Sequence, residues 1–313
     1  MATIAKNRAT KAIKNAPIEV FKPFSFEQKH LIEAGSLHTQ ALYDWVTEAT
    51  QIKKQKVIAK RHWYIVSPPG LGKTYTVQRC AREHNIQLTM VQGATSPAAF
   101  VKQMALAVYM HTVINKSKKP IFVCVDDCDE LFSGKESLNI MKGVMDNERN
   151  VLAYEKDMTS QIKSFRNSES PVTLMMADAM EHYQSQGGLG LEVPMGQVSF
   201  IVLSNKELAS EADARRKASL MHEVAVRSRV NYRPINATGR EMWGFAASVL
   251  LNSDVLGEEH KLSVAQKHIL LDFMYSNWDK MPGTDLRSIT EYAADMINSP
   301  SDYIDRWTMR LEH

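Results

Sequence analysis

The glycine-rich turn SPPGLGKT at residues 67–74 constrains the fold most, because the segments on both sides of it have clear patterns. The segment before it, WYIV at 63–66, is short, apolar and partly β-branched, which is typical of a buried parallel strand. The segment after it, 75–85, has the apolar spacing of a helix. Such a strand–turn–helix unit aims backbone N–H groups at one point beside the positive end of the helix dipole. The sequence therefore predicts an anion-binding turn in an α/β fold.

The turn fits the phosphate-binding pattern G-x-x-x-x-G-K-[ST], with Ser67 in place of the first glycine. Lys73 can then reach the β- and γ-phosphates of a nucleotide, and the Thr74 hydroxyl can ligate Mg²⁺. A fortuitous glycine turn is the alternative, which the flanking strand and helix disfavour. We expect the nucleotide-binding residues to be Pro69, Gly70, Leu71, Gly72, Lys73, Thr74 and Tyr75.

A second motif follows at the end of the apolar run 121–127, which closes with Asp126 and Asp127. A strand that ends in two acids can supply one carboxylate to a magnesium shell and a second one that polarises the attacking water. Asp126 is the candidate for the metal side, together with Thr74, and Asp127 is the candidate for the water side. The alternative is that both acids simply face solvent.

The sequence resembles the AAA+ ATPases over roughly residues 40–300. The resemblance rests on five segments in the order of that family, namely PPGLGKT (68–74), IFVCVDDCDEL (121–131), FIVLSN (200–205), AVRSRV (225–230) and GTDLR (283–287). It implies an enzyme that hydrolyses ATP with Mg²⁺ at the interfaces of a homo-oligomer, a ring or spiral such as a hexamer.

The resemblance also implies roles for polar residues beyond the two motifs. Asn205 matches sensor 1, which orients water and the γ-phosphate, and Arg287 matches the sensor 2 arginine. Arg229 matches the arginine finger that acts on the ATP of the neighbouring subunit, with Arg227 as a second candidate. A planar guanidinium stays charged and can bridge phosphate oxygens as negative charge builds. The alternative for each of these residues is that it has no role in catalysis and is simply a turn or surface residue.

Two departures from the family pattern bear on activity and architecture. Most members carry Glu where this chain has Asp127, which is one methylene shorter, so we expect slow turnover. The gap between Asp126 and Asn205 exceeds the usual one by several tens of residues, so we expect an insertion within 148–197.

The order of elements predicts the fold class. Strands alternate with helices up to about residue 236, and only helical periods follow from Gly239 onward. This order is typical of an α/β fold with a parallel sheet flanked by helices, followed by a small all-helical lid domain. We expect a flexible basic arm over 1–25, a nucleotide-binding domain over 26–236 and the lid over 237–313.

Composition argues against two classes of protein. The chain has three cysteines, and Cys124 and Cys128 lie in or beside one apolar run, which does not make a disulfide framework. No segment approaches the ~18 consecutive apolar residues of a membrane helix. We therefore expect a cytoplasmic protein with reduced cysteines and no membrane contact.

These motifs leave the macromolecule on which the ATPase acts undecided. The net charge of +3 alone does not point to nucleic acid. A loader-like role in DNA replication or recombination is favoured by the Asp-Asp strand end and by two groups of basic residues, for which a solvated surface is the alternative. The basic residues are Lys6, Arg8, Lys11, Lys14, Lys53, Lys54, Lys56, Lys60 and Arg61.

Two other functions stay open. A protein remodeller would thread polypeptide past a pore loop, for which Phe100 and the loop 186–193 are candidates, although no glycine follows Phe100. The third hypothesis is a switch or scaffold that binds ATP and hydrolyses it slowly. The stretch VDDCDELF at 125–132 also resembles AAA+ proteins of tailed bacteriophages, which concerns origin and not function.

Overall fold

The computed structural model describes residues 23–50, 60–93, 95–146, 148–184, 190–253, 260–281 and 283–311. The chain divides into two compact units. The larger unit comprises Leu42–Pro68 and Lys73–Ile235, and the smaller unit comprises residues up to Ala41, Pro69–Gly72 and the chain from Asn236 onward. The predicted basic arm, apart from residues 23–25, lies outside the described residues.

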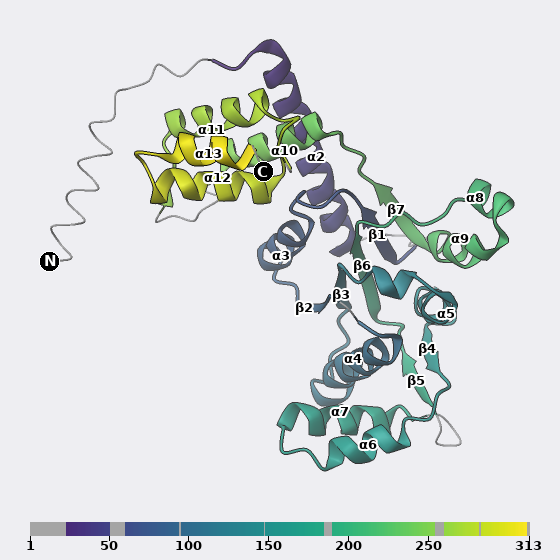
Figure 1. The fold of residues 1–313 in the computed structure, drawn as a ribbon. Helices are drawn as coiled ribbons and strands as arrows, with labels where there is room; N and C mark the ends of the chain where they lie inside the picture. Colours follow the sequence, from purple (N-terminus) through teal and green to yellow (C-terminus); the bar gives the residue numbers. More distant parts are fainter. Residues whose placement is uncertain are drawn as a thin grey trace, which may run out of the picture. The chain divides into compact units, whose positions relative to one another are not determined.

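A parallel sheet of five strands lies at the centre of the larger unit, in the order β2-β3-β6-β1-β7 (Figure 1). This confirms the predicted α/β fold class. The strands are β1 (His62–Val66), β2 (Leu88–Gln92), β3 (Ile121–Asp126), β6 (Val198–Ser204) and β7 (Val230–Pro234).

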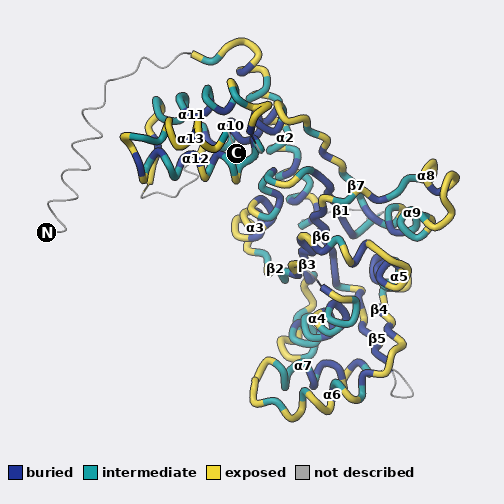
Figure 2. Tube along the Cα trace, viewed as in Figure 1, coloured by how far each residue is buried: buried dark blue, intermediate teal, exposed yellow. Residues whose placement is uncertain are grey.

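The three inner strands are buried along their whole length, as Figure 2 shows in dark blue. A parallel strand buried on both faces needs a nearly continuous apolar sequence, which explains the runs WYIV and IFVCV. The cysteines of the chain, Cys80, Cys124 and Cys128, are all free and buried.

Helices connect and flank the strands of this sheet. Ser96 caps the helix after β2, and Pro97 occupies its first turn. The flanking elements are α3 (Lys73–Glu83), α4 (Pro97–Tyr109), η2 (Met110–Ile114), η3 (Asp129–Phe132), α5 (Lys135–Val144), α8 (Glu211–Arg216), η4 (Ala218–Leu220) and α9 (Met221–Arg227).

The segment 148–197 is folded around a two-stranded antiparallel sheet, with two helices between its strands. Its elements are β4 (Val151–Tyr154), α6 (Thr159–Arg166), α7 (Pro171–His182) and β5 (Leu191–Pro194). Helix α7 packs beside α4 (Figure 1), and Leu152, Met180 and Val193 belong to the same buried cluster as the strands of the large sheet. The segment therefore extends the core of the larger unit.

The smaller unit contains the C-terminal helices α10 (Gly239–Asn252), α11 (Val264–Ser276), α12 (Leu286–Asn298) and α13 (Tyr303–Leu311). Trp243 and Trp307 are fully buried in its core, and their indole N–H groups donate to the carbonyls of Leu271 (3.1 Å) and Tyr292 (3.2 Å). Among the described residues, none of the helices is both long enough and apolar enough to cross a bilayer.

Helix α2 (Phe26–Thr50) is a single helix, and the boundary between the units falls within it. Its first part packs closely on α10, because a Cβ at Gly35 would lie 2.4 Å from the Gly244 carbonyl carbon. The sequence placed residues 26–41 with the sheet, whereas contacts group them with the C-terminal helices. The boundary between a nucleotide-binding domain (26–236) and a lid domain (237–313) stays a prediction.

Candidate functional site

The turn at 67–74 leaves strand β1 and enters helix α3 at Lys73. Gly70 and Gly72 have φ of 80° and 64°, a left-handed backbone that glycine adopts at little cost. Ser67 is not among the described residues with positive φ, and its N–H donates to the Ser204 carbonyl at 3.2 Å. The backbone at Ser67 therefore does not need the glycine that the motif usually has there.

Lys73 is buried, with only 7% of its surface exposed, and its ammonium group is surrounded by oxygen atoms. It donates to the carbonyl and the hydroxyl of Ser67 (2.9 and 3.0 Å), to the Pro68 carbonyl (3.2 Å) and to Asn205 Oδ1 (2.9 Å). Buried charges require such hydrogen bonds. A cation is thus held at the turn, where it can neutralise phosphate.

Thr74 and Asp126 are in direct contact, although they lie on different elements. The Thr74 hydroxyl donates to Asp126 Oδ2 at 2.7 Å, and Asp126 is 5% exposed at the end of β3. Within the described residues, no group of three or more His, Cys, Asp or Glu side chains could hold a metal ion. The hydroxyl and carboxylate are hard oxygen ligands that suit Mg²⁺, which commonly takes its remaining ligands from water and phosphate. The residues present therefore fit a magnesium ion bound together with a nucleotide.

Asn205 links the turn to the second acid of the strand end. Its Oδ1 accepts from Lys73 at 2.9 Å, and its Nδ2 donates to Asp127 Oδ1 at 3.2 Å. Asp127 has φ of 52°, a conformation that Asp and Asn adopt more readily than most residues. Its side chain is exposed, so it can meet a water molecule. Sequence-predicted residues from the turn, β3 and β6 are therefore brought together.

Gln92 is a member of this cluster that the sequence analysis missed. Its Nε2 donates to Asp126 Oδ2 at 3.2 Å, and it is directly opposite Asp126 in the register of β2 and β3. The signal that could have found it is its position as the last residue of the strand next to β3. Polar residues at the carboxyl ends of adjacent parallel strands come close together.

The two candidate finger residues differ in their surroundings. Arg227 donates to the Leu208 carbonyl at 2.8 Å, and its guanidinium lies 4.1 Å from the centroid of the Tyr232 ring. Arg229 donates to the Ala225 carbonyl at 2.6 Å, and its Nε lies 3.5 Å from Asp146 Oδ2. Arg227 is thus held by a carbonyl and a ring, whereas Arg229, whose side chain is about one-third exposed, is held by a carbonyl and a weak ion pair.

Arg287 lies in the smaller unit, in the first turn of α12, and is exposed. Asp285 caps this helix by accepting from the Ser288 N–H at 3.0 Å. Gly70, which groups with this unit, accepts from the Leu286 N–H at 3.4 Å, and a Cβ on Gly70 would lie 2.3 Å from the Asp285 side chain. Gly70 is therefore constrained by this close approach as well as by its backbone.

The other predicted nucleotide-binding residues differ in exposure. Leu71 is buried at 2% exposure, Tyr75 is 60% exposed, and Pro69 is exposed. Only Lys60 and Arg61 of the predicted basic cluster at 53–61 lie within the described residues. Gly190 and β5 are the described part of the loop at 186–193.

Comparison with family models gives one match that covers the site. Residues 63–205 match the family described as ATPase family associated with various cellular activities (AAA). The matched range contains the turn, both acids and Asn205, whereas Arg229 and Arg287 fall outside it. A comparison with curated proteins gave no match.

Proposed function

The chain carries a domain of the AAA ATPase family over residues 63–205, and we propose that ATP hydrolysis at subunit interfaces drives loading of a macromolecule in DNA replication or recombination. AAA proteins are ATPases that couple the nucleotide to remodelling, commonly as oligomers and typically with Mg²⁺. The loader-like task and the roles of individual residues are the parts that we propose.

The contact between Thr74 and Asp126 is the observation that carries the enzymatic part of the proposal. The Thr74 hydroxyl lies 2.7 Å from the buried Asp126 carboxylate at the end of β3, so both oxygens are close enough to bind the same divalent cation. When bound there, Mg²⁺ would neutralise charge on the β- and γ-phosphates.

The remaining polar groups of the cluster support a division of roles. Lys73 binds the terminal phosphates, because its ammonium group is held at the turn between Ser67 and Asn205 and can exchange one of these bonds for a phosphate oxygen. Asp127 accepts a proton or hydrogen bond from the attacking water, and Asn205, bonded to both Lys73 and Asp127, orients that water relative to the phosphate. We expect slow turnover, since Asp127 is shorter than the usual glutamate.

We propose Arg229 as the finger that acts on the ATP of a neighbouring subunit, and Arg287 as the sensor of the helical unit. Both arginines are partly exposed and each donates to a backbone carbonyl, so the choice of Arg229 is supported by its weak ion pair with Asp146, where Arg227 has a ring contact with Tyr232. A guanidinium near the γ-phosphate stabilises the charge that builds in the transition state.

One observation bears on the choice between loading and threading. Phe100, the aromatic residue that sequence reasoning considered for a pore loop, is fully buried in the core of the larger unit. It therefore cannot contact a threaded polypeptide in this conformation, which argues against threading through a pore loop at Phe100. Lys60 and Arg61 add little to the loader-like proposal, because they donate to the carbonyls of Val230 (3.0 Å) and Gly196 (2.5 Å).

Replacement of the turn lysine tests the enzymatic proposal. We expect Lys73→Ala to weaken ATP binding by about 30-fold or more, because hydrogen bonds to charged groups contribute about 2 kcal/mol each. Isothermal titration calorimetry would measure this, with Lys163→Ala as a matched control on the exposed face of α6. Equal affinities of wild type and Lys73→Ala would refute the assignment of the turn.

Nucleic-acid dependence tests the proposed task. The steady-state ATPase rate of the full chain would be measured alone and with single-stranded DNA, duplex DNA or RNA. We expect DNA to change the rate several-fold. A flat response to all three would leave the ATPase in place and favour protein remodelling.

A further inference from the structure

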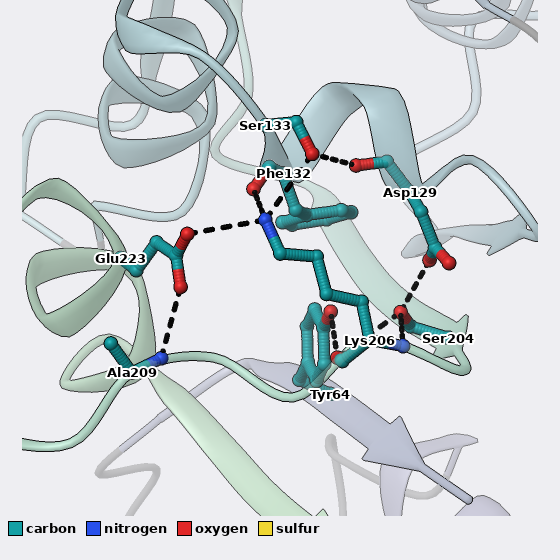
Figure 3. Close-up of polar contacts among 8 residues, drawn as sticks. All are labelled: Tyr64, Asp129, Phe132, Ser133, Ser204, Lys206, Ala209 and Glu223. Atoms are coloured by element: carbon teal, nitrogen blue, oxygen red, sulfur yellow. Dashed lines mark hydrogen bonds and ion pairs between the residues drawn. The ribbon is translucent and has the colours of Figure 1, made fainter. Parts of the chain in front are cut away.

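Asn205 is followed by Lys206, whose side chain belongs to a second polar network, drawn in Figure 3. The Lys206 ammonium donates to the Phe132 carbonyl at 2.6 Å and to the Ser133 hydroxyl at 3.2 Å, and it pairs with Glu223 Oε1 at 3.1 Å. An ammonium group has three donors, and each has an acceptor here. The Lys206 side chain is therefore held at its tip by η3 and by α9.

The backbone on both sides of Asn205 is held as well. The Lys206 N–H donates to the Ser204 hydroxyl at 2.9 Å, and the Lys206 carbonyl accepts from the Tyr64 hydroxyl at 2.8 Å. The Ser204 hydroxyl in turn donates to Asp129 (Figure 3). Burial raises the pKa of the Tyr64 phenol well above its usual value, so this group stays a donor. The peptide that carries Asn205 is thus fixed between β1 and η3.

Glu223 extends the network to the helix that precedes Arg229. While Oε1 binds Lys206, Oε2 accepts from the Ala209 N–H at 3.1 Å. One turn later on α9, Arg227 donates to the Leu208 carbonyl at 2.8 Å. Helix α9 is therefore attached to the loop after Asn205 at three points.

The surroundings of this pair set it apart from surface ion pairs. The side chains of Lys206 and Glu223 are 30% and 14% exposed, and each makes further hydrogen bonds. Removing one member leaves the other charge partly buried without its partner, which costs more than breaking an exposed pair. The pair between Lys156 and Glu136, at 2.6 Å, has side chains 63% and 52% exposed and provides a natural comparison.

We propose that Lys206 and Glu223 are positioning residues for ATP hydrolysis, which hold Asn205 and helix α9 in one fixed arrangement. The ion pair then controls two orientations. One is that of Asn205 in the subunit's own site, and the other is that of Arg229 toward the site of the next subunit. This inference rests on the proposed function, because that proposal gives Asn205 and Arg229 their roles in hydrolysis. Lys206 and Glu223 take no part in the chemistry beyond fixing those two residues.

The first test separates positioning from binding. The full chain would be prepared as Lys206→Met, Glu223→Gln and the double variant, and kcat and the ATP dissociation constant would be measured for each. We expect kcat to fall about tenfold in each single variant, which equals about 1.4 kcal/mol of transition-state stabilisation, with affinity within about twofold. The double variant should lose no more than either single one, because one interaction is broken in all three.

Three further variants exclude a purely structural explanation. Glu223→Asp keeps the charge and should recover part of kcat. Lys156→Met and Glu136→Gln break the exposed control pair and should leave kcat unchanged. The inference is overturned by single variants that keep kcat within about twofold, by losses that add in the double variant, or by loss of ATP binding along with turnover.

A mixing experiment tests the link to Arg229. Arg229→Ala subunits would be combined with Asp127→Asn subunits, or with Asp127→Asn subunits that also carry Glu223→Gln. We expect the second combination to restore clearly less activity, since its Arg229 is held less firmly. Equal restoration by both would overturn the link. A wild-type chain that neither binds nor hydrolyses ATP would instead refute the proposed function, so the two failures are distinguishable.

Discussion

At the scale of single residues, Asn205 and Asp127 account for the geometry of the candidate site. Asn205 bonds at the same time to Lys73 at 2.9 Å and to Asp127 at 3.2 Å, so its amide bridges the ammonium group and the carboxylate. Asp127 has φ of 52°, where Asp is tolerated better than the longer Glu of the usual motif. The backbone therefore offers a physical reason for the shorter acid at this position.

Asp127→Asn should remove hydrolysis without removing the nucleotide. Asn also tolerates the left-handed conformation, so we expect an intact fold and an ATP affinity within about threefold of wild type. Loss of a general base typically costs 10²–10⁴ in rate, so kcat should fall about 100-fold or more. Phosphate release under single-turnover conditions would measure this, and a kcat close to that of wild type would exclude Asp127 as the residue that activates water.

At the scale of elements, close packing determines where glycine is required. In the smaller unit, the first part of α2 and helix α10 approach at Gly35 and Gly244, and a Cβ on Gly244 would lie 2.2 Å from the Leu31 carbonyl oxygen. Gly143 in α5 differs, because the nearest atom to an added Cβ would be the Val151 carbonyl oxygen at 4.0 Å. Glycine is thus required where α2 crosses α10, whereas the glycine at position 143 of α5 can be replaced.

Gly35→Ala should destabilise the smaller unit, whereas Gly143→Ala should not harm the larger one. We expect Gly35→Ala to cost about 1–3 kcal/mol, since the added carbon forces backbone shifts. Gly143→Ala should gain up to about 1 kcal/mol from helix propensity. Thermal unfolding followed by circular dichroism would compare them, and a neutral Gly35→Ala would show that the crossing of α2 and α10 can relax.

At the scale of the whole molecule, the question is whether a site is complete within one subunit. The turn, both acids and Asn205 meet within one chain, but Arg229 contacts Ala225 and Asp146 instead of this cluster. A finger supplied by a neighbour would complete the site, which agrees with the common oligomerisation of AAA proteins.

Mixing two inactive variants tests this sharing of sites. Arg229→Ala should keep ATP binding and lose turnover by about 10³-fold, the lower end for an arginine finger. Adding Asp127→Asn subunits, which retain Arg229, should restore part of the activity. Titration of one variant against the other would give a maximum at intermediate ratios. Absence of recovery at every ratio would contradict a finger that acts between subunits.

The sequence by itself determined the elements whose chemistry lies in contiguous residues. The turn at 67–74, the pair Asp126–Asp127 and Asn205 each follow an apolar strand, and the carboxyl ends of parallel strands meet at one edge of a sheet. Periodicity was enough to predict the α/β class, and motif spacing was enough to predict the turn and the two acids. Asn205 was assigned from the resemblance to the AAA+ family.

Only the tertiary structure decided the contacts that join segments far apart in the chain. Periodicity does not specify which side chains face each other across strands and helices, so the contact of Gln92 with Asp126 and the pairing of Lys206 with Glu223 were not foreseen. The grouping of the first part of α2 with the C-terminal helices also depends on a close approach at Gly35. The physical reason is that packing selects one arrangement among many that the same local patterns allow.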